Sequence, residues 1–229
     1  MTADVGVIIV AAGSGSRVGG AELKQFRWIA GKPMLLHSVH TFQERADVGM
    51  VVVVLPREHV GDPPPWLFQC DTERLLLSVG GRNRTDSVRN GLEDLADAAR
   101  IVVIHDAARP LVTATVIERV IAEARRGHGA AAGVPVVDSL KSADHEGSIT
   151  GSIDRSGIFR VQTPQAYPRE MIERAYAAAK SAGVDATDDS ALCERLGLPV
   201  VIVPGSERAL KITEELDFAR AEALSILNE

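Results

Sequence analysis

The sequence predicts an α/β fold in which helices cover both faces of a mostly parallel sheet. Short, solidly apolar runs alternate with segments of helical periodicity over the first 135 or so residues, which is typical of parallel strands buried on both faces. Glycines and polar residues follow these runs, at the sheet edge where such folds bind ligands. At 229 residues, the chain can bury a core without disulfides or metal.

The expected elements follow from the periodicity of apolar residues. The first strand is Val5–Val10, and the helix after it carries an apolar face that includes Leu35, Val39 and Phe42. Three consecutive prolines at 63–65 exclude a regular helix between residues 57 and 70, so we expect a surface loop or a short helix there. The further expected strands are 50–55, 75–79, 101–104 and 130–134, and the expected helices are 33–46, 84–98 and 114–126. This alternation predicts a Rossmann-like sheet.

The pattern changes after Pro135. Two short runs, 136–142 and 148–155, flank a polar turn and indicate a β-hairpin. Its apolar content is too low for it to fold alone. We therefore expect a protruding β-arm, at about 136–157, that packs on a partner subunit.

The remaining chain is expected to return to the sheet at 159–163. It then forms helices at 169–182 and 187–196 and a strand at 200–203. Thr213 is expected to cap a last helix at 214–227, whose first turn carries Glu214 and Glu215, as the helix dipole prefers. We expect a single domain over 1–229, with no further catalytic domain after this helix.

Composition excludes several classes of protein. A net charge of −6 argues against broad nucleic-acid binding. Cys70 and Cys193 lack metal-binding spacing and are expected to be ordinary reduced thiols. The N-terminus has no basic region of a signal peptide, and no apolar run reaches the roughly 18 residues of a membrane helix. We expect a soluble, cytoplasmic protein that binds neither nucleic acid nor membrane.

The stretch from Val5 to Phe26 carries the strongest chemical signal. A strand leads into a glycine-rich loop that is followed by two cations, Arg17 and Lys24. Glycines let backbone N–H groups approach a phosphate closely, and the cations neutralise its charge. The stretch therefore predicts a phosphate site, with a plain glycine-rich turn as the alternative.

Two familiar phosphate loops do not fit this stretch. The dinucleotide-binding fingerprint requires a third glycine where Val18 stands. The nucleoside-triphosphatase loop requires Lys and Ser or Thr after its last glycine, where this chain has Ala21 and Glu22. Further polar residues follow the third strand, at Gly80–Gly81, and the fourth, at 105–110. Because the carboxyl ends of parallel strands share one sheet edge, we expect these clusters to converge on one site.

Read together, the motifs resemble those of the 2-C-methyl-D-erythritol 4-phosphate cytidylyltransferase family, within the sugar-nucleotidyltransferase superfamily. The resemblance runs from about residue 7 to residue 216, nearly the whole chain. The matching motifs are Ala11-Ala12-Gly13-Ser14-Gly15-Ser16-Arg17, Lys24-Gln25, Gly80-Gly81 with Arg84 and Ser87-Val88, His105-Asp106-Ala107-Ala108-Arg109-Pro110, Asp154-Arg155, Thr163-Pro164-Gln165 and Lys211-Ile212-Thr213.

This resemblance implies transfer of CMP from CTP to 2-C-methyl-D-erythritol 4-phosphate, releasing pyrophosphate, in non-mevalonate isoprenoid biosynthesis. It also implies Mg²⁺ or another divalent cation, and a homodimer joined through arm 136–157. The residues implied to be catalytic are Arg17, Lys24, Arg155 and Lys211. Those implied to bind the nucleotide are Ala11, Ala12, Gly13, Gly15, Gly80, Gly81, Ser87 and Asp106. Those implied to bind the acceptor are Asp106, Arg109, Ser139, Arg155, Thr163 and Lys211.

The resemblance implies that Ser139 and Arg155 of each arm complete the partner's site. Asp106 is the nearest candidate for a metal ligand, although the direct ligands stay unknown. Arg84 has two open roles, nucleotide contact and structural ion pairing. We expect His105 to be structural, because an already ionised attacking phosphate needs no base.

The sequence departs from the family pattern at three positions, where Val10 and Leu23 replace frequent prolines and Ser139 replaces a frequent threonine. None of the three changes removes a charge. One alternative is a cytidylyltransferase for another polyol phosphate, such as ribitol 5-phosphate. Another is a non-catalytic nucleotide-binding domain, against which the joint presence of Arg17, Lys24, Asp106, Arg155 and Lys211 argues.

Overall fold

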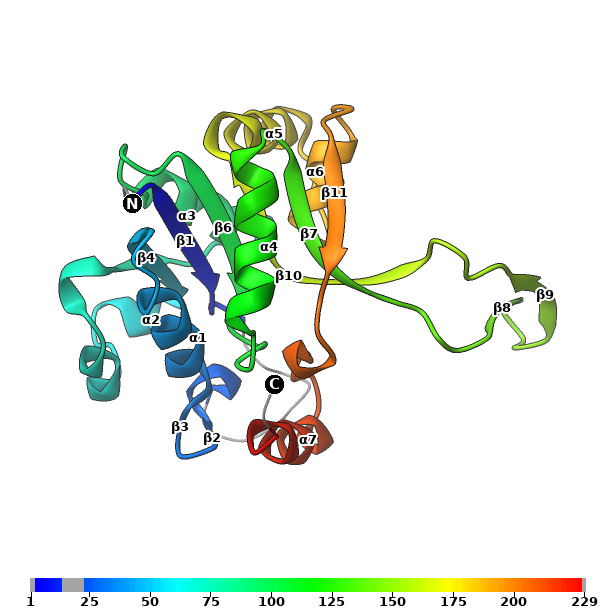
Figure 1. Cartoon of the computed structure of the whole chain (residues 1–229), viewed down its shortest axis with the longest axis horizontal. Helices are drawn as coiled ribbons and strands as arrows, with labels where there is room; N and C mark the ends of the chain where they lie inside the picture. The colour runs from blue at the N-terminus through cyan, green and yellow to red at the C-terminus, as the bar shows by residue number, and fades with distance from the viewer. Residues whose placement is uncertain (1–2, 14–22, 228–229) are drawn as a thin grey trace.

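A computed structural model describes residues 3–13 and 23–227, and its body is a sheet with helices on both faces (Figure 1). In the described part of the chain, the main sheet has seven strands in the order β11-β7-β10-β6-β1-β4-β5. They are β1 (Val5–Val10), β4 (Val48–Leu55), β5 (Leu75–Val79), β6 (Ile101–Asp106), β7 (Gly129–Pro135), β10 (Phe159–Pro168) and β11 (Val200–Pro204). The predicted α/β class is confirmed.

The sheet is parallel except at β10. Strand β1 pairs in parallel with β4 and β6, β4 with β5, and β11 with β7, whereas β10 runs antiparallel to both β6 and β7. A strand that returns to its neighbour without a helical crossover must run antiparallel. Because Val10 lies opposite Asp106 in the register, β1 and β6 end at the same edge of the sheet.

Alternating residues of β1 divide the core between the two faces. Val7 and Ile9 pack in a cluster with α1 and α4, whereas Ile8 packs in another with α3, α5 and α6. The helices are α1 (Met34–Gln43), α2 (Arg57–Val60), α3 (Arg84–Asp94), α4 (Ala114–Arg125), α5 (Arg169–Ala182), α6 (Asp189–Glu194) and α7 (Glu215–Ser225). Short 3₁₀ helices lie at Lys24–Phe26, Pro65–Gln69, Thr72–Arg74 and Glu207–Ala209. No helix in these described stretches is long and apolar enough to span a membrane.

Several boundaries differ from those that the sequence predicts. Helix α3 ends at Asp94 rather than residue 98, because Leu95 turns to an extended conformation. A small hairpin, β2 (Trp28–Ile29) with β3 (Lys32–Pro33), was not expected. The N-cap of α7 is Glu214 rather than Thr213, because Glu214 and Asp217 form a reciprocal capping box. The Thr213 hydroxyl donates to Asp217 instead.

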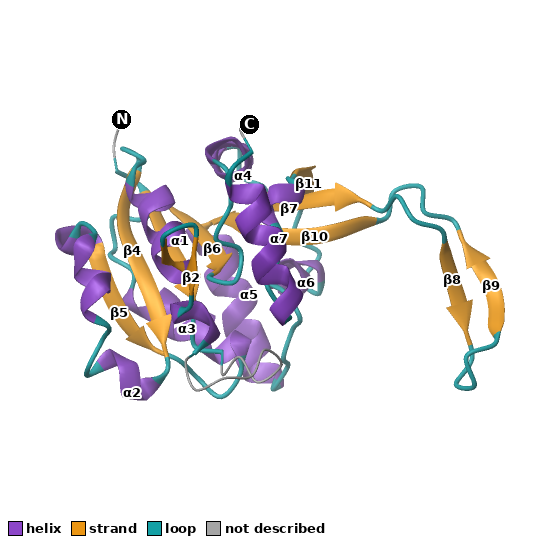
Figure 2. Ribbon diagram, turned by 90° about the horizontal axis from the view of Figure 1, so that it is seen from below, coloured by secondary structure: helices purple, strands orange, loops and turns teal. Residues whose placement is uncertain are grey.

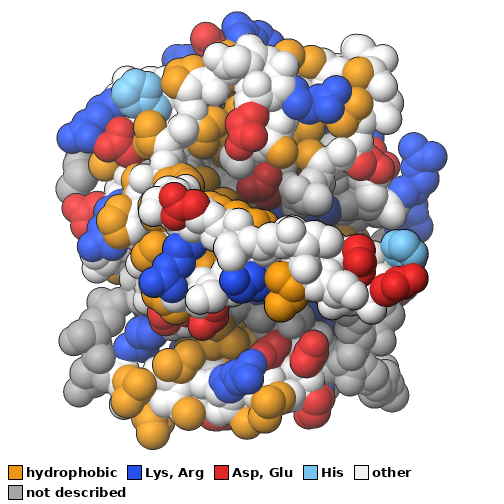
Figure 3. All heavy atoms as spheres, turned by 90° about the vertical axis from the view of Figure 1, so that its right-hand side faces the viewer, with side chains coloured by type: hydrophobic (Ala, Val, Ile, Leu, Met, Phe, Trp, Pro, Cys, Tyr) orange, Lys and Arg blue, Asp and Glu red, His pale blue; other side chains and the backbone are white. Residues whose placement is uncertain are grey.

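The hairpin at 136–157 lies outside the main sheet. Its strands β8 (Leu140–Ala143) and β9 (Ile149–Ile153) pair antiparallel and extend away from the body (Figures 1 and 2). Val137 and Ile149 are 68% and 69% exposed. Figure 3 views the molecule with this arm toward the reader, and hydrophobic side chains lie among charged ones on that face. The arm is thus a polar hairpin with several uncovered apolar side chains.

Candidate active site

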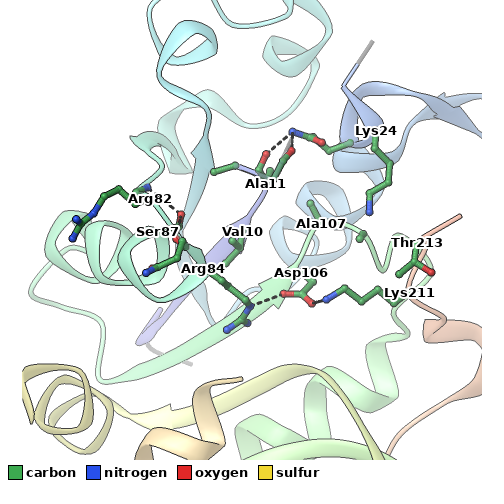
Figure 4. A pocket seen from close by; sticks show the side chains of 16 residues that line it. Val10, Ala11, Lys24, Arg82, Arg84, Ser87, Asp106, Ala107, Lys211 and Thr213 are labelled. Carbon is green, nitrogen blue, oxygen red and sulfur yellow. Dashed lines mark hydrogen bonds and ion pairs between the residues drawn. The ribbon is translucent and has the colours of Figure 1, made fainter. Parts of the chain in front are cut away.

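A pocket of about 500 Å³ lies at the edge where β1 and β6 end. Five described segments line it: the end of β1, the 3₁₀ helix at Lys24–Phe26, the turn into α3, the end of β6 and the stretch before α7 (Figure 4). The lining residues are Val10, Ala11, Ala12, Gly13, Lys24, Gln25, Gly81, Arg82, Asn83, Arg84, Ser87, Asp106, Ala107, Ala108, Lys211 and Thr213. The predicted convergence of clusters on one edge is therefore present.

Asp106 stands at the centre of this pocket, between two cations. Lys211 Nζ donates to Asp106 Oδ2 over 2.7 Å, and Arg84 Nε donates to Oδ1 over 3.1 Å. Figure 4 shows Arg84 and Lys211 approaching the carboxylate from opposite sides. Burial by itself would raise the pKa of Asp106, but Arg84 and Lys211 outweigh it and hold that pKa well below its usual value. Asp106 therefore stays ionised, with its charge shared between two cations.

Arg84 also forms a bidentate ion pair with Asp189. Its Nη1 and Nη2 atoms donate to the two carboxylate oxygens over 2.9 and 2.8 Å. Burial by itself would lower the pKa of Arg84, but Asp189 and then Asp106 raise it above its ordinary value. Of the two roles that the sequence leaves open, ion pairing is present, and Arg84 also lines the pocket. The sequence alone does not single out Asp189, because its partner Arg84 lies 105 positions away.

The segment after the first loop folds back onto the pocket. Lys24 Nζ donates to the carbonyl of Ile212 over 2.7 Å. Gln25 Nε2 donates to the carbonyls of Ala11 and Gly13 over 2.6 and 3.2 Å. Lys24 is thereby placed beside the segment that carries Lys211. The predicted site residues Arg17 and Gly15 lie outside the described residues.

Gly80 and Gly81 allow the turn before α3 to lie close to its neighbours. A Cβ added at Gly80 would be 2.3 Å from Ala12 Cβ, and one added at Gly81 would be 2.1 Å from Asp86 Cβ. The Ser87 hydroxyl accepts from the Gly81 N–H over 3.0 Å and donates to a backbone carbonyl of the same turn. The glycines thus allow the turn before α3 to pack tightly beside the pocket, whose lining includes Gly81. Their assignment to the nucleotide stays a prediction.

Arg109 and Thr163 lie beside the pocket rather than in its lining. Arg109 is buried, donates to the Ala209 carbonyl over 2.7 Å, and lines a second cavity of about 690 Å³. The two cavities share Lys211 and Thr213. The Thr163 hydroxyl accepts from the Asp106 N–H over 2.9 Å and lines neither cavity. The assignment of both residues to the acceptor stays a prediction.

His105 is fully buried next to Asp106. One ring nitrogen is 3.1 Å from the Arg109 carbonyl, and the other is 3.3 Å from the Thr163 hydroxyl. Burial lowers the pKa of His105 to about 4, so the ring is neutral at physiological pH. It does not line the pocket, which fits the structural role expected for it.

Ser139 and Arg155 are not brought to this pocket within one chain. Both are exposed on the arm, where Arg155 donates to the carbonyl of Val137. The arm extends away from the body that holds the pocket (Figures 1 and 2). Any contribution of these two residues to an active site would therefore be made to another copy of the chain.

Among the described residues that line the 500 Å³ pocket, Asp106 is the single acidic one. Both of its oxygens accept hydrogen bonds from cationic side chains. Within 3–13 and 23–227, no group of three or more His, Cys, Asp and Glu side chains could hold a metal ion. The described lining offers a metal one carboxylate, so a divalent ion here would take most of its other ligands from substrate phosphates and water.

Known proteins resemble this chain over almost its entire length. The family model for "IspD: 2-C-methyl-D-erythritol 4-phosphate cytidylyltransferase" matches residues 5–228. The enzyme of that name from Syntrophus aciditrophicus is 39% identical over 230 residues, covering 97% of this chain and 96% of the relative. The one from Roseobacter denitrificans is 42% identical over 220 residues, covering 96% of both.

A solved structure shares the fold as well. The crystal structure of 2-C-methyl-D-erythritol 4-phosphate cytidylyltransferase from Thermus thermophilus aligns with a TM-score of 0.82 at 32% identity, covering 98% of this chain and 100% of that one. The resemblance seen in the motifs is thereby confirmed. The chain belongs to the 2-C-methyl-D-erythritol 4-phosphate cytidylyltransferase family, and it is a nucleotidyltransferase of isoprenoid biosynthesis.

Proposed function

We propose that this chain transfers the cytidylyl group of CTP to 2-C-methyl-D-erythritol 4-phosphate. An oxygen of the acceptor phosphate forms a bond to the α-phosphorus of CTP. The bond from that phosphorus to the bridging oxygen of the β-phosphate breaks, and its electron pair leaves with pyrophosphate. The products are 4-diphosphocytidyl-2-C-methyl-D-erythritol and pyrophosphate. The observation that carries the proposal is the cationic pocket around Asp106 in a chain that matches the family over residues 5–228.

Charge neutralisation is the main task of this site. Both reactants are anionic, and repulsion must be overcome before the acceptor oxygen reaches phosphorus. Lys24, Arg84 and Lys211 line the pocket, and Arg109 lines the adjoining cavity. Lys24 stabilises the charge that develops on the triphosphate, together with Arg17. Lys211 exchanges part of its bond with Asp106 for the acceptor phosphate.

The nucleotide occupies the small-residue wall of the pocket. Ala11, Ala12, Gly13 and Gly81 line it and leave backbone groups within reach of a ligand. These groups and the Ser87 hydroxyl recognise the hydrogen-bonding edge of a cytosine ring. A purine is larger and would overfill this part of the pocket. The Asp106 carboxylate accepts hydrogen bonds from substrate hydroxyls while Arg84 fixes its orientation.

A divalent cation, Mg²⁺ in the first instance, accompanies the triphosphate. The donor set supports an ion that arrives with the triphosphate, because Asp106 is the only acidic group in the described part of the pocket lining and is already paired. Asp106 is the residue nearest to such an ion. When bound, the ion neutralises charge on the phosphates.

The active protein is a homodimer joined through arm 136–157, with each arm supplying Ser139 and Arg155 to the partner's acceptor site. Exposed apolar side chains on the arm support this assembly, because Val137, Ile149 and Ile153 are 68%, 69% and 45% exposed. A single nucleotidyltransferase domain spans 1–229. The cytoplasm is its compartment, in keeping with two unpaired cysteines.

Pyrophosphate release tests the proposed acceptor. Purified protein, CTP and Mg²⁺ are supplied with methylerythritol phosphate in one reaction and ribitol 5-phosphate in another. Turnover with the first supports the proposal. Turnover with ribitol 5-phosphate alone would move the chain to another polyol phosphate, and turnover with neither would indicate a non-catalytic domain.

A further inference from the structure

Asp189 lies behind the pocket, out of reach of any substrate in it. It is the first residue of α6, its side chain is 0% exposed, and it does not line the pocket. It nevertheless accepts three hydrogen bonds from two side chains. The Arg84 guanidinium donates twice, and the Tyr176 hydroxyl donates once over 2.5 Å. A buried carboxylate with this many donors is held in one orientation.

These contacts extend into an alternating row of charges. Lys211 pairs with Asp106, Asp106 pairs with Arg84, and Arg84 pairs with Asp189. The row contains two cations and two anions, so its formal charge is zero. Removing the Asp189 charge would leave Arg84 with Asp106 as its remaining carboxylate partner in the row. The row would then carry one uncompensated positive charge, which is costly where the guanidinium is largely buried.

The geometry of Arg84 shows what Asp189 contributes to the pocket. The two Nη atoms of the guanidinium face Asp189, which leaves the Nε atom directed at Asp106 Oδ1. A planar guanidinium held by its fork cannot rotate without breaking two bonds. One oxygen of Asp106 is therefore reserved for Arg84, and Lys211 bonds to the other.

We infer that Asp189, held by Tyr176, is a positioning residue that fixes Arg84 on Asp106 and so keeps Lys211 available to the acceptor phosphate. Without it, the guanidinium loses the fork contact that fixes its orientation, the Nε bond to Asp106 Oδ1 is no longer held, and Asp106 no longer keeps Lys211 in place for its substrate. The inference rests on the proposed function, in which Lys211 binds the acceptor. It assigns no direct contact with substrate to Asp189.

Asp189→Asn tests this inference, with Asp188→Asn as the matched control. Asp188 is the neighbouring N-cap of α6 and receives the Ala191 N–H, but it has no contact with Arg84. Both variants remove one carboxylate charge from the start of the same helix. We expect kcat/KM for the acceptor to fall about 10–100-fold in Asp189→Asn, as misplacement of a catalytic group does, and to change less than about twofold in Asp188→Asn. An equal fall in both variants would overturn the inference, because it would report helix stability.

The Nε–H resonance of Arg84 in ¹⁵N NMR spectra gives a readout that does not depend on turnover. The resonance is assigned as the one that is missing from the spectrum of Arg84→Lys. In the unmodified protein and in Asp188→Asn, the bond to Asp106 should protect this proton from solvent exchange. In Asp189→Asn, the signal should be lost to exchange. A retained signal, or unchanged kcat/KM despite a lost signal, would overturn the inference.

Misfolding of Asp189→Asn and failure of the proposed function can each be distinguished from failure of this inference. If Asp189→Asn does not fold, Tyr176→Phe removes one donor without changing charge. It should lower kcat/KM severalfold and broaden the same signal, whereas unchanged values of both would contradict the inference. If the unmodified protein has no turnover with methylerythritol phosphate, the proposed function fails. The NMR comparison still decides whether Asp189 anchors Arg84.

Discussion

The ammonium group of Lys24 donates to the carbonyl oxygen of Ile212 over 2.7 Å, although 188 positions separate the two residues. This bond ties the segment after the first loop to the segment that carries Lys211. Two lysines from opposite ends of the chain thereby reach the rim of one pocket. Because Lys24 lies at this pocket, its proposed role in stabilising charge on the triphosphate can be tested by substitution.

Lys24→Ala is expected to lower kcat by about 10²–10³, because it removes a cation at the place where charge develops on the triphosphate. The melting temperature should change little, since a hydrogen bond at a pocket rim is worth about 1 kcal/mol. Steady-state kinetics and thermal unfolding measure the two effects. Lys180→Ala, at an exposed position on α5, is the control. A near-normal kcat for Lys24→Ala would remove this residue from the mechanism.

Gly80→Ala is expected to weaken CTP binding. The added Cβ would lie 2.3 Å from Ala12 Cβ and would push the pocket wall inward. Overpacking of this kind costs about 1–3 kcal/mol, so KM for CTP should rise about tenfold or more. Gly61→Ala is the control, because a Cβ there meets nothing within 4 Å and the backbone is in the right-handed helical region. Equal KM values for the two variants would contradict the packing explanation.

Stability should fall when the pH drops below the ordinary pKa of histidine. Burial lowers the pKa of His105 from 6.5 to about 4 in the folded chain. Between these values, the unfolded chain binds more protons than the folded chain, so acidification favours unfolding. From pH 7 to pH 5, His105 should account for a loss of about 2 kcal/mol in the free energy of unfolding.

Urea unfolding at several pH values measures this loss. Burial also lowers the pKa of His37 and His40, which adds to the loss in the same pH range. Comparison with His105→Gln isolates the contribution of the buried ring, because this variant should show a shallower pH dependence. If both proteins lose the same free energy between pH 7 and pH 5, His105 is not the group responsible.

The shared-site proposal predicts that two inactive variants restore each other's activity. Arg155→Ala removes an arm residue, and Lys24→Ala removes a residue of the body. In a mixed dimer, one site would carry both changes and the other neither. An equal mixture that has exchanged subunits should recover about a quarter of the normal turnover. Mixed dimers can be isolated with two different affinity tags, and their failure to recover activity would contradict sharing of the site.

The sequence was informative where the structural signal is local. Solid apolar runs located the strands, and strand 75–79 and helix 169–182 have the boundaries predicted. The ends of β1 and β6 indicated the site, because a stretch of small residues and glycines follows β1 and a carboxylate, Asp106, ends β6 after its apolar run 101–104. The motif Lys211–Thr213 could be assigned to the same site through the family resemblance, although it is distant in the chain.

The features that the sequence did not predict depend on contacts between residues far apart in the chain, and no local sequence pattern indicates such contacts. The Arg84–Asp189 ion pair joins residues 105 positions apart. The sequence does hint at a separate role for Asp189. Two consecutive acidic residues stand at the start of α6, and the helix uses only Asp188 as its N-cap. Arg160 and Arg220 also line the second cavity, but the sequence around them gave no such hint, because each resembles an ordinary surface charge. Likewise, the antiparallel course of β10 follows from the arm's return path rather than from its own residues.

Phosphorus NMR of a complete reaction tests the cytidylyl transfer most directly. The unmodified protein is mixed with CTP, methylerythritol phosphate and Mg²⁺, and the phosphorus resonances are followed over time. The resonances of CTP and of the acceptor monoester should decline together. A pair of mutually coupled doublets from the new diphosphate diester should grow in equal proportion to pyrophosphate. Persistence of the acceptor monoester while CTP is consumed, or release of orthophosphate with CDP, would contradict this activity.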